Sequence, residues 1–409
     1  MNRSSSRQNK IRICVLGNFS GRNAGDIAIL GCLMQDVSAQ YAQVQFVVPT
    51  ISPGFLKKGF PQYDLEAVSL QPWALSLKIF GLPVFRAVLS SDIVLVTDNI
   101  LFDMKLLNPV FNYLSTLSLV LPMAARRGIP IVLYNMSLGP VTSRLGKWCF
   151  DRVIRNSSQI ILRDTQSLDL IEKLGIPHVP VTIGADCALN ATPVSAERLQ
   201  EIIQTEALFS NPVGTIGFNI NAYLDAYIRR GQGFSTQLFT DIVAKVVDRL
   251  IEEVGLDVLF IITQVMDQRI TDKALEAIRH PEHVKVISNK TYSYEQLTAV
   301  LSQVEVLVGM RTHALILASS VGTPVVGIVS YPKTAGYLNT IEQGSWTIKF
   351  ADLNVNALFD LVYDAYTQRQ QIRSSLLPAV KREKLKASAS AMLLEPLLVE
   401  KQATALNYR

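Results

Sequence analysis

The stretch Val304–Tyr337, VEVLVGMRTHALILASSVGTPVVGIVSYPKTAGY, decides the fold class of the chain. Its first apolar run, 304–308, is short and uninterrupted, which is typical of a buried strand in a parallel sheet. The block 314–318 is apolar on every side and predicts a buried helix, which ends before Gly322. A second strand is expected at 325–329. This alternation of buried strand, buried helix and buried strand predicts an α/β domain with a parallel sheet.

Three polar residues lie where this pattern places a ligand site. Arg311 and His313 stand between the end of a strand and the start of a helix, and Lys333 is expected in the loop after the next strand. Open α/β sheets bind ligands at such ends, and a helix N-terminus stabilises an anion by roughly 0.3–2 kcal/mol. A guanidinium matches carboxylate or phosphate, and an imidazole transfers protons near neutral pH.

These residues together predict a site for a small, multiply charged anion that must be protonated. The alternative is structural: Arg311 would cap a carbonyl group and His313 would be a buried histidine with satisfied hydrogen bonds. The spacing Arg-x-His with a downstream lysine, all at the ligand edge, favours the site.

The segment GMRTHALILASSVGTPVVGIVSYPK resembles the C-terminal signature of the polysaccharide pyruvyl transferase family. Members usually show G-x-R-x-H and, further on, G-x-P, a strand, a tyrosine and a lysine. The resemblance implies two domains similar to those of GT-B glycosyltransferases. It also implies transfer of a pyruvyl group from phosphoenolpyruvate to sugar hydroxyls as a ketal. The implied donor carries one carboxylate and one phosphate. It is therefore a small, multiply charged anion of the kind that Arg311, His313 and Lys333 predict.

The composition limits the number of domains, the size of the core and the class of ligand. The chain has 409 residues, enough for two domains, and 49% of them are apolar, so a large core is expected. The net charge of +5, from 39 basic and 34 acidic residues, is mild and includes no basic stripe dense enough for nucleic acid. It suits an anionic substrate or an anionic membrane surface.

The cysteines and the most apolar helix indicate a cytoplasmic protein. Four cysteines are scattered without a C-x-x-C pair, which predicts free thiols in a reducing compartment. No His/Cys/Asp cluster has the spacing of metal ligands, so neither a metal nor another cofactor is expected. The apolar stretch Tyr113–Ala125 is shorter than the roughly twenty residues that cross a bilayer, and it predicts a buried helix. Location is expected to be cytoplasmic, with peripheral contact at the inner face of the membrane.

The N-terminal region predicts a glycine-rich loop between a strand at 11–16 and a helix from Ile27 to about Tyr41. The loop is GNFSGRNAGD, with Asp26 as the expected N-cap. Family members usually have G-x-x-x-x-x-N-x-G-D-E-A-I here, and Ile27 replaces the usual glutamate. The resemblance makes Asn23 and Asp26 weak candidates for binding the acceptor. A glycine-rich turn followed by a cap is the structural alternative.

Two further strand ends carry weak candidates for acceptor binding. Asp98 lies in TDNILFD after the strand at 92–96, where many family members have a run of glycines. Asn135 begins NMSLGP after the strand at 131–134, which resembles the family's G-Q-G-I-G-P with its first glycine missing. Asn135 would either bond a sugar hydroxyl or close a turn.

A second arginine follows the strand at 159–162. RDTQSLDLIEKLG resembles the family pattern R-D/E-x-x-S-x-x-x-L-x-x-L-G. Arg163 would be a second anion clamp, across the cleft from Arg311. The alternative is local pairing with Asp164 or Asp169.

The predicted fold class is α/β, with two Rossmann-like parallel-sheet domains facing a cleft, similar to GT-B. The expected divisions are a disordered tail, an N-terminal acceptor-side domain, a C-terminal donor-side domain and a C-terminal helix that packs back on the first domain: 1–10, 11–190, 191–375 and 376–409. The last helix is expected at Ala379–Leu398. Polar residues after the strand at 258–263, Asp267 among them, would face a substrate or solvent.

The resemblance implies a mechanism in which Arg163, Arg311 and Lys333 hold phosphoenolpyruvate. His313 protonates the enol carbon, so that His313 and Arg311 are the expected catalytic residues. The partners are then phosphoenolpyruvate and a saccharide acceptor, free or lipid-linked. One alternative is a GT-B-like glycosyltransferase that uses a nucleotide sugar. Another is a non-catalytic binding module on the same scaffold.

Overall fold

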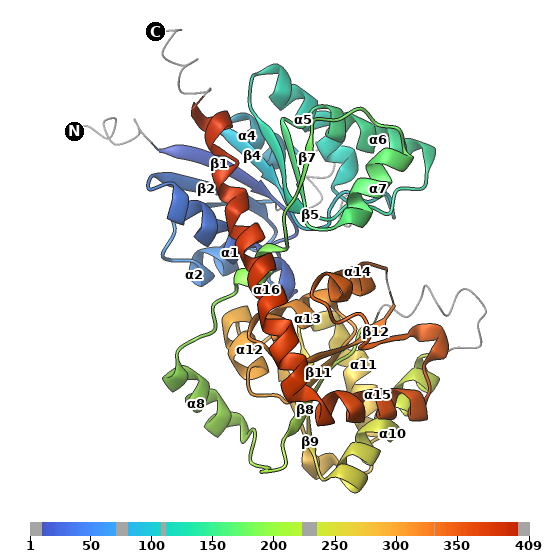
Figure 1. The fold of residues 1–409 in the computed structure, drawn as a ribbon. Coiled ribbons are helices and arrows are strands. Elements are labelled where there is room, and N and C mark those ends of the chain that lie inside the picture. Colours follow the sequence, from blue (N-terminus) through green and yellow to red (C-terminus); the bar gives the residue numbers. More distant parts are fainter. Residues whose placement is uncertain (1–9, 71–80, 108–111, 223–234, 331, 400–409) are drawn as a thin grey trace. The chain divides into compact units, whose positions relative to one another are not determined.

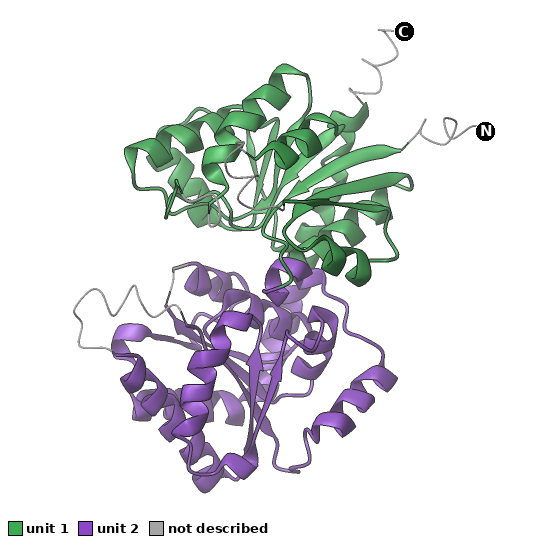
Figure 2. Ribbon diagram, turned by 180° about the vertical axis from the view of Figure 1, so that it is seen from behind, with its two compact units in different colours: residues 1–21, 29–187, 384–409 green, residues 22–28, 188–383 purple. Residues whose placement is uncertain are grey.

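The computed structural model describes residues 10–70, 81–107, 112–222, 235–330 and 332–399 (Figure 1). Almost all of the expected tail, and the tyrosine of the signature, lie outside the described residues. The chain forms two compact units (Figure 2). Unit 1 contains the residues up to Gly21, Ile29–Cys187 and the residues from Lys384 on. Unit 2 contains Arg22–Ala28 and Ala188–Glu383.

Unit 1 is built on a sheet of seven parallel strands in the order β3-β2-β1-β4-β5-β6-β7. The strands are β1 Ile11–Leu16, β2 Val44–Thr50, β3 Leu65–Ser69, β4 Ile93–Val96, β5 Ile131–Met136, β6 Gln159–Leu162 and β7 Val181–Ile183. The central strand β1 pairs with β2 and β4, and Ile13 stands opposite both Phe46 and Ile93. Strand β4 is buried on both faces, and its sequence is an uninterrupted apolar run; β1 is apolar and buried from Ile13 on.

Helices link the strands of unit 1. They are α1 Ala24–Gln40, α2 Pro53–Gly59, α4 Leu82–Leu89, α5 Leu114–Arg126, α6 Arg144–Arg155 and α7 Thr165–Lys173. The helix α1 begins in unit 2 and continues into unit 1. Side-chain oxygens of Ser143 and Asp164 accept hydrogen bonds from the first turns of α6 and α7, which fixes where these helices start.

Unit 2 contains six parallel strands in the order β10-β9-β8-β11-β12-β13. They are β8 Thr215–Asn219, β9 Asp257–Ile262, β10 Val284–Ser288, β11 Val306–Gly309, β12 Val325–Val329 and β13 Thr347–Lys349. The α-helices are α8 Ala196–Glu206, α10 Thr236–Arg249, α11 Gln268–Glu276, α12 Tyr294–Leu301, α13 Thr312–Ser320, α14 Pro332–Thr340 and α15 Val355–Thr367, and a π-helix, Leu250–Val254, extends α10. Short 3-10 helices of unit 2 are Val265–Asp267, Pro281–His283 and Phe350–Asp352, and another, Cys187–Asn190, spans the boundary between the units.

Both sheets have the strand order of a Rossmann domain. Counted along the chain within each unit, the order is third, second, first, fourth, fifth and sixth, and in unit 1 a seventh strand follows the sixth. This confirms the prediction of two Rossmann-like parallel-sheet domains. The order reverses between β1 and β4 in unit 1 and between β8 and β11 in unit 2, which are the points where such sheets bind ligands.

Three local predictions were wrong. Asp26 does not cap α1, because the helix begins two residues earlier, at Ala24. Lys333 does not lie in a loop but in the first turn of α14. The last helix, α16 Arg369–Met392, starts well before Ala379. Its early turns are helical because apolar side chains at a spacing of four are buried, at positions Ile372, Leu376 and Val380.

Within the described ranges, no helix combines the length and the apolar character that crossing a bilayer requires. The predicted buried helix around Tyr113–Ala125 is α5, with most of its side chains inside unit 1.

We predict that thiol reagents will not modify the native protein. All four cysteines are free and buried, and burial raises the pKa of Cys14 and of Cys187. A thiol that is inaccessible and protonated reacts slowly. Titration with a chromogenic disulfide should detect no rapid reaction without denaturant and four thiols in denaturant. One fast-reacting thiol in the native protein would contradict this burial.

Candidate functional site

The site begins at the ligand edge of the unit 2 sheet. Strand β11 ends at Gly309, and Arg311 is the N-cap residue of α13. From Ala314 on, the side chains of α13 are buried, as its apolar sequence predicts. Because β11 adjoins β8 where the strand order reverses, Arg311 and His313 lie at the switch point of this sheet.

A buried carboxylate orients the guanidinium of Arg311. Asp267, at the end of the 3-10 helix after β9, is 0% exposed and forms a two-point ion pair with Nε and Nη2 of Arg311. The Nη2–Oδ1 distance is 2.7 Å. The same Oδ1 accepts the backbone N–H of Ala222 at 2.9 Å. A buried carboxylate requires such partners, so Asp267 holds the guanidinium in one orientation.

Asn219 joins the three central strands of unit 2 at this edge. It ends β8 and is 1% exposed. Its Nδ2 donates to the carbonyl of Ile261 in β9 at 2.7 Å, and its Oδ1 accepts the N–H of Arg311 at 3.2 Å. Sequence reasoning missed Asn219, and it considered Asp267 only as facing a substrate or solvent. The available signal for Asn219 was an amide side chain at the last position of a mostly apolar strand.

The glycine-rich loop of the N-terminal region contributes to the same edge of unit 2. Its residue Ala24 donates a backbone hydrogen bond to Thr263 at 2.8 Å, and Val265 donates to the carbonyl of Arg22 at 3.0 Å. Asn23 therefore lies opposite Gln264 in an antiparallel bridge. Arg22–Ala28 lies within the division expected at 11–190 and belongs to unit 2.

Asn23 is the residue that caps α1. Its Oδ1 accepts the N–H of Gly25 at 3.0 Å, and its Nδ2 donates to Oδ1 of Asp26 at 2.7 Å. Asp26 lies in the first helical turn, 5% exposed, where a carboxylate is favoured by the helix dipole. The hydrogen bond between Asn23 and Asp26 therefore fixes the side chains of both candidate residues of this loop.

Gly25 packs directly against His313. A Cβ atom built on Gly25 would overlap the Cβ, Cγ and Nδ1 atoms of His313. Only a glycine leaves room for the imidazole at this point. The packing brings the two motifs that the sequence analysis singled out at opposite ends of the chain into contact within one unit.

Helix α14 begins beside α13. Thr334 is 1% exposed, and its Oγ1 lies 2.9 Å from Oγ1 of Thr312. Tyr337, one turn later, shares a hydrogen bond with Ser319 of α13. Lys333 precedes Thr334 in the first turn of α14, the helix that follows β12.

Arg163 of unit 1 forms an ion pair with Asp186. Their side chains are 12% and 4% exposed. The carboxylate of Asp164 caps α7 by accepting hydrogen bonds from Ser167. Burial alone would lower the pKa of Arg163, but Asp186, Asp98 and Asp164 outweigh it and raise this pKa. Nearby carboxylates therefore stabilise the charged form of the guanidinium.

Asp98 and Asn135 both adopt a left-handed backbone conformation, which glycine adopts most easily. Their φ angles are +67° and +46°, in the left-handed region that aspartate and asparagine tolerate better than most residues. The side chain of Asn135 points inward: Nδ2 donates to the carbonyl of Ala387 at 3.3 Å, and Oδ1 accepts from Ser390 at 2.8 Å. We assign Asn135 a structural role, because it is 1% exposed.

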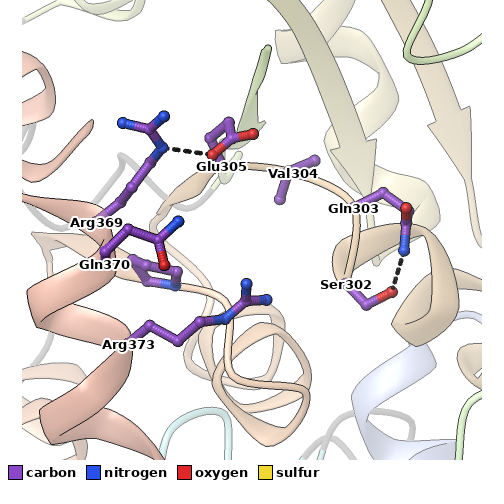
Figure 3. A pocket seen from close by; sticks show the side chains of 8 residues that line it. Ser302, Gln303, Val304, Glu305, Arg369, Gln370 and Arg373 are labelled. Carbon is purple, nitrogen blue, oxygen red and sulfur yellow. Dashed lines mark hydrogen bonds and ion pairs between the residues drawn. The ribbon is translucent and has the colours of Figure 1, made fainter. Parts of the chain in front are cut away.

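A small pocket of about 110 Å³ lies elsewhere on unit 2 (Figure 3). It lies where β11 and β12 begin, whereas Arg311 follows the end of β11. Arg369 donates to Glu305 at 2.6 Å on its wall. None of the candidate site residues from the sequence analysis lines this pocket. Its lining comprises Ser302, Gln303, Val304, Glu305, Pro324, Arg369, Gln370 and Arg373.

Comparisons with known proteins identify relatives. The family model described as polysaccharide pyruvyl transferase matches residues 23–331, well over half of the chain. The amylovoran biosynthesis protein AmsJ of Erwinia amylovora is 24% identical over 273 residues. That alignment spans 63% of this chain and 62% of the relative, so it covers less than two thirds of AmsJ.

Solved structures share the fold at low identity. HepE of Anabaena in complex with UDP-glucose has a TM-score of 0.59 at 13% identity, covering 96% of this chain and 100% of that one. UDP-GlcNAc 2-epimerase of Neisseria meningitidis, bound to UDP-GlcNAc, has a TM-score of 0.64 at 12% identity and covers 95% and 99%. Such neighbours, glycosyltransferases and epimerases, confirm the GT-B-like fold class.

Replacing Gly25→Ala is expected to displace His313. Overpacking of this kind costs about 1–3 kcal/mol of unfolding free energy. The matched control is Gly54→Ala in α2, where an added Cβ meets nothing within 4 Å and should stabilise by up to about 1 kcal/mol. Denaturant unfolding of both variants measures this. Equal stability of the two variants would contradict the close packing of Gly25 on His313.

We expect the substitution Asp267→Asn to lower the free energy of unfolding by roughly 3 kcal/mol or more, because it leaves the largely buried Arg311 without its carboxylate. Asp272→Asn, one turn further along α11, removes an acid that accepts from Gln268 near the surface and should change stability by less than about 0.5 kcal/mol. Denaturant unfolding of both variants measures the two changes in stability. A loss in Asp267→Asn no larger than in Asp272→Asn would show that the pair does not hold Arg311.

Proposed function

This chain belongs to the polysaccharide pyruvyl transferase family, and on that premise we propose that it transfers a pyruvyl group from phosphoenolpyruvate to two hydroxyls of a saccharide. The products are a pyruvate ketal and phosphate. Family membership makes the protein a transferase. The observation that carries the donor assignment is the packing of Gly25 on His313 beside the anchored Arg311, at the switch point of unit 2.

The donor anion would bind where α13 begins. Phosphoenolpyruvate carries a carboxylate and a phosphate, and a helix N-terminus supplies N–H groups and a positive dipole end to such groups. Arg311, oriented by Asp267, adds a planar donor, and Lys333 at the start of α14 adds a point charge. Arg163 remains a weaker candidate for this role, because the carboxylates around it oppose a second anion.

In the first step His313 would act as a general acid. Its imidazolium donates a proton to the methylene carbon of phosphoenolpyruvate, which becomes a methyl group, and the adjacent carbon gains oxocarbenium character. The first saccharide hydroxyl attacks that carbon and gives up its proton. The cationic side chains orient the donor and stabilise charge on the phosphate.

In the second step the ketal closes. A second hydroxyl of the same saccharide attacks the same carbon, the carbon–oxygen bond to phosphate breaks, and phosphate leaves with the bonding electron pair. The two hydroxyl protons balance the proton used on the methyl group and the one taken up by phosphate. Asp26, held near Gly25 by Asn23, is the weak candidate for the base that accepts a hydroxyl proton.

The acceptor would be a sugar of a cell-surface polysaccharide or its precursor. The similarity to AmsJ, an amylovoran biosynthesis protein, supports this class. Asn23 and Asp98 are the candidate contacts to the saccharide. Four buried free thiols are typical of a reducing compartment, so we propose that the reaction takes place in the cytoplasm.

A second candidate function is glycosyl transfer from a nucleotide sugar. It draws support from the bound ligand of HepE, UDP-glucose, and from that of the epimerase, UDP-GlcNAc. The same switch-point edge would then hold a diphosphate in place of phosphoenolpyruvate.

We predict that His313→Gln will lower turnover by roughly 10²–10⁴-fold and leave donor binding largely intact, because glutamine keeps polarity but transfers no proton. Phosphate release from phosphoenolpyruvate in the presence of a saccharide acceptor measures turnover. Thermal stabilisation by phosphoenolpyruvate alone measures binding and should reach about 2.7 kcal/mol at a hundred times the dissociation constant. His283→Gln, at an exposed histidine that pairs with Asp257, is the control.

Normal turnover in His313→Gln would refute the acid role. Stabilisation by UDP-sugars without any by phosphoenolpyruvate would favour the second candidate function.

A further inference from the structure

Helices α5 and α6 of unit 1 lie side by side (Figure 1). Both expose large apolar side chains. On α6, Leu145 is 47% and Trp148 is 51% exposed. Arg152 connects the two helices, because its guanidinium lies 4.9 Å from the Trp148 ring centroid and its Nε donates to the carbonyl of Ser118 in α5 at 2.9 Å. The ring of Trp148 is thus held at the surface.

Two neighbouring elements extend this surface. On α5, Leu119 and Met123 are each 39% exposed. In the loop after β4, Met104 is 59% and Leu107 is 80% exposed. Asp103 ties this loop to the start of α6, because its carboxylate accepts the N–H groups of Thr142, at 2.7 Å, and of Ser143. We name the six apolar side chains the α5–α6 face: Met104, Leu107, Leu119, Met123, Leu145 and Trp148.

The charges around the α5–α6 face are positive. Five exposed basic residues accompany its three elements: Lys105, Arg126, Arg127, Arg144 and Lys147. The nearby acids are engaged within the protein. Asp103 accepts backbone N–H groups, and Asp151 pairs with Arg155 at 2.8 Å. A surface of tryptophan, leucine and methionine set among lysine and arginine is complementary to an anionic interface with an apolar interior.

We propose that the α5–α6 face docks unit 1 onto a bilayer that contains anionic phospholipids. Basic side chains near such a surface contribute attraction, and partly exposed tryptophan and leucine insert at the headgroup level. An exposed apolar surface needs a partner, and the surrounding positive charge selects an anionic one.

The α5–α6 face adjoins the ligand edge of the unit 1 sheet. The loop that carries Met104 and Leu107 follows β4, and α6 follows the loop after β5, so both start at the strand ends where Asp98 lies. Docking there would bring that edge to the membrane surface. This consequence rests on the proposed function, because it identifies the acceptor as a lipid-linked saccharide presented at the bilayer.

The test is flotation of the full chain with vesicles of phosphatidylcholine alone and of equimolar phosphatidylcholine and phosphatidylglycerol. Wild-type protein should float with the anionic vesicles only, and high salt should release it. Arg144→Gln with Lys147→Gln should weaken the partition by about 25-fold, at about fivefold per charge. Leu145→Ser with Trp148→Ser should weaken it by roughly tenfold or more.

Two controls accompany these variants. Trp148→Phe keeps an aromatic side chain and should retain binding. Leu238→Ser with Lys245→Gln makes matched changes at exposed positions of α10 in unit 2 and should bind as wild type does.

Three results would overturn the proposal. The first is no flotation of wild-type protein, and the second is equal flotation of wild type and both double variants on the α5–α6 face. The third is concentration-dependent self-association that these variants abolish without any vesicle binding, which would make the face a contact between copies. Turnover with a water-soluble saccharide requires no membrane, so it separates a failure here from a failure of the proposed function.

Discussion

The structure depends most on the space between Gly25 and His313. A side chain at position 25 would overlap the imidazole, so the first turn of α1 can approach α13 only through a glycine. Asn23 caps α1 at this point, and Ala24 bonds to the chain that leaves β9. One close contact therefore sets the start of α1, the start of α13 and the end of β9 relative to one another. The same α1 continues into unit 1 from Ile29 on.

A buried ion pair stands at the ligand edge of each sheet, Arg163 with Asp186 and Arg311 with Asp267. Such pairs add little net stability, because desolvating both charges costs about as much as their attraction returns. Such a pair fixes an orientation, because a carboxylate that is itself held in place holds the planar guanidinium in one position. At the edge of unit 1, the charges of Asp98 and Asp164 also act on Arg163.

Elements with strong local patterns could be predicted to the residue. The strands β1, β6 and β12 match their expected bounds because most of their residues are apolar and buried. The edge strand β3 alternates between partial and full exposure, and it has no such run. Helix α16 starts earlier than expected because tertiary packing, through Ile372 and Leu376, stabilises turns whose local sequence is mostly polar.

The sequence by itself determined the two Rossmann-like sheets, the position of Arg311 and His313 at a strand end, and the family resemblance. Each of these depends on residues close together in the chain. Tertiary structure alone decided that Arg22–Ala28 belongs to unit 2, that Asp267 is the partner of Arg311, and that Asn135 faces inward. These outcomes join residues far apart in sequence, and the energy of each contact exists only after the sheets have brought them together. Periodicity encodes burial within an element, but it contains no information on which distant partner fills the space beside it.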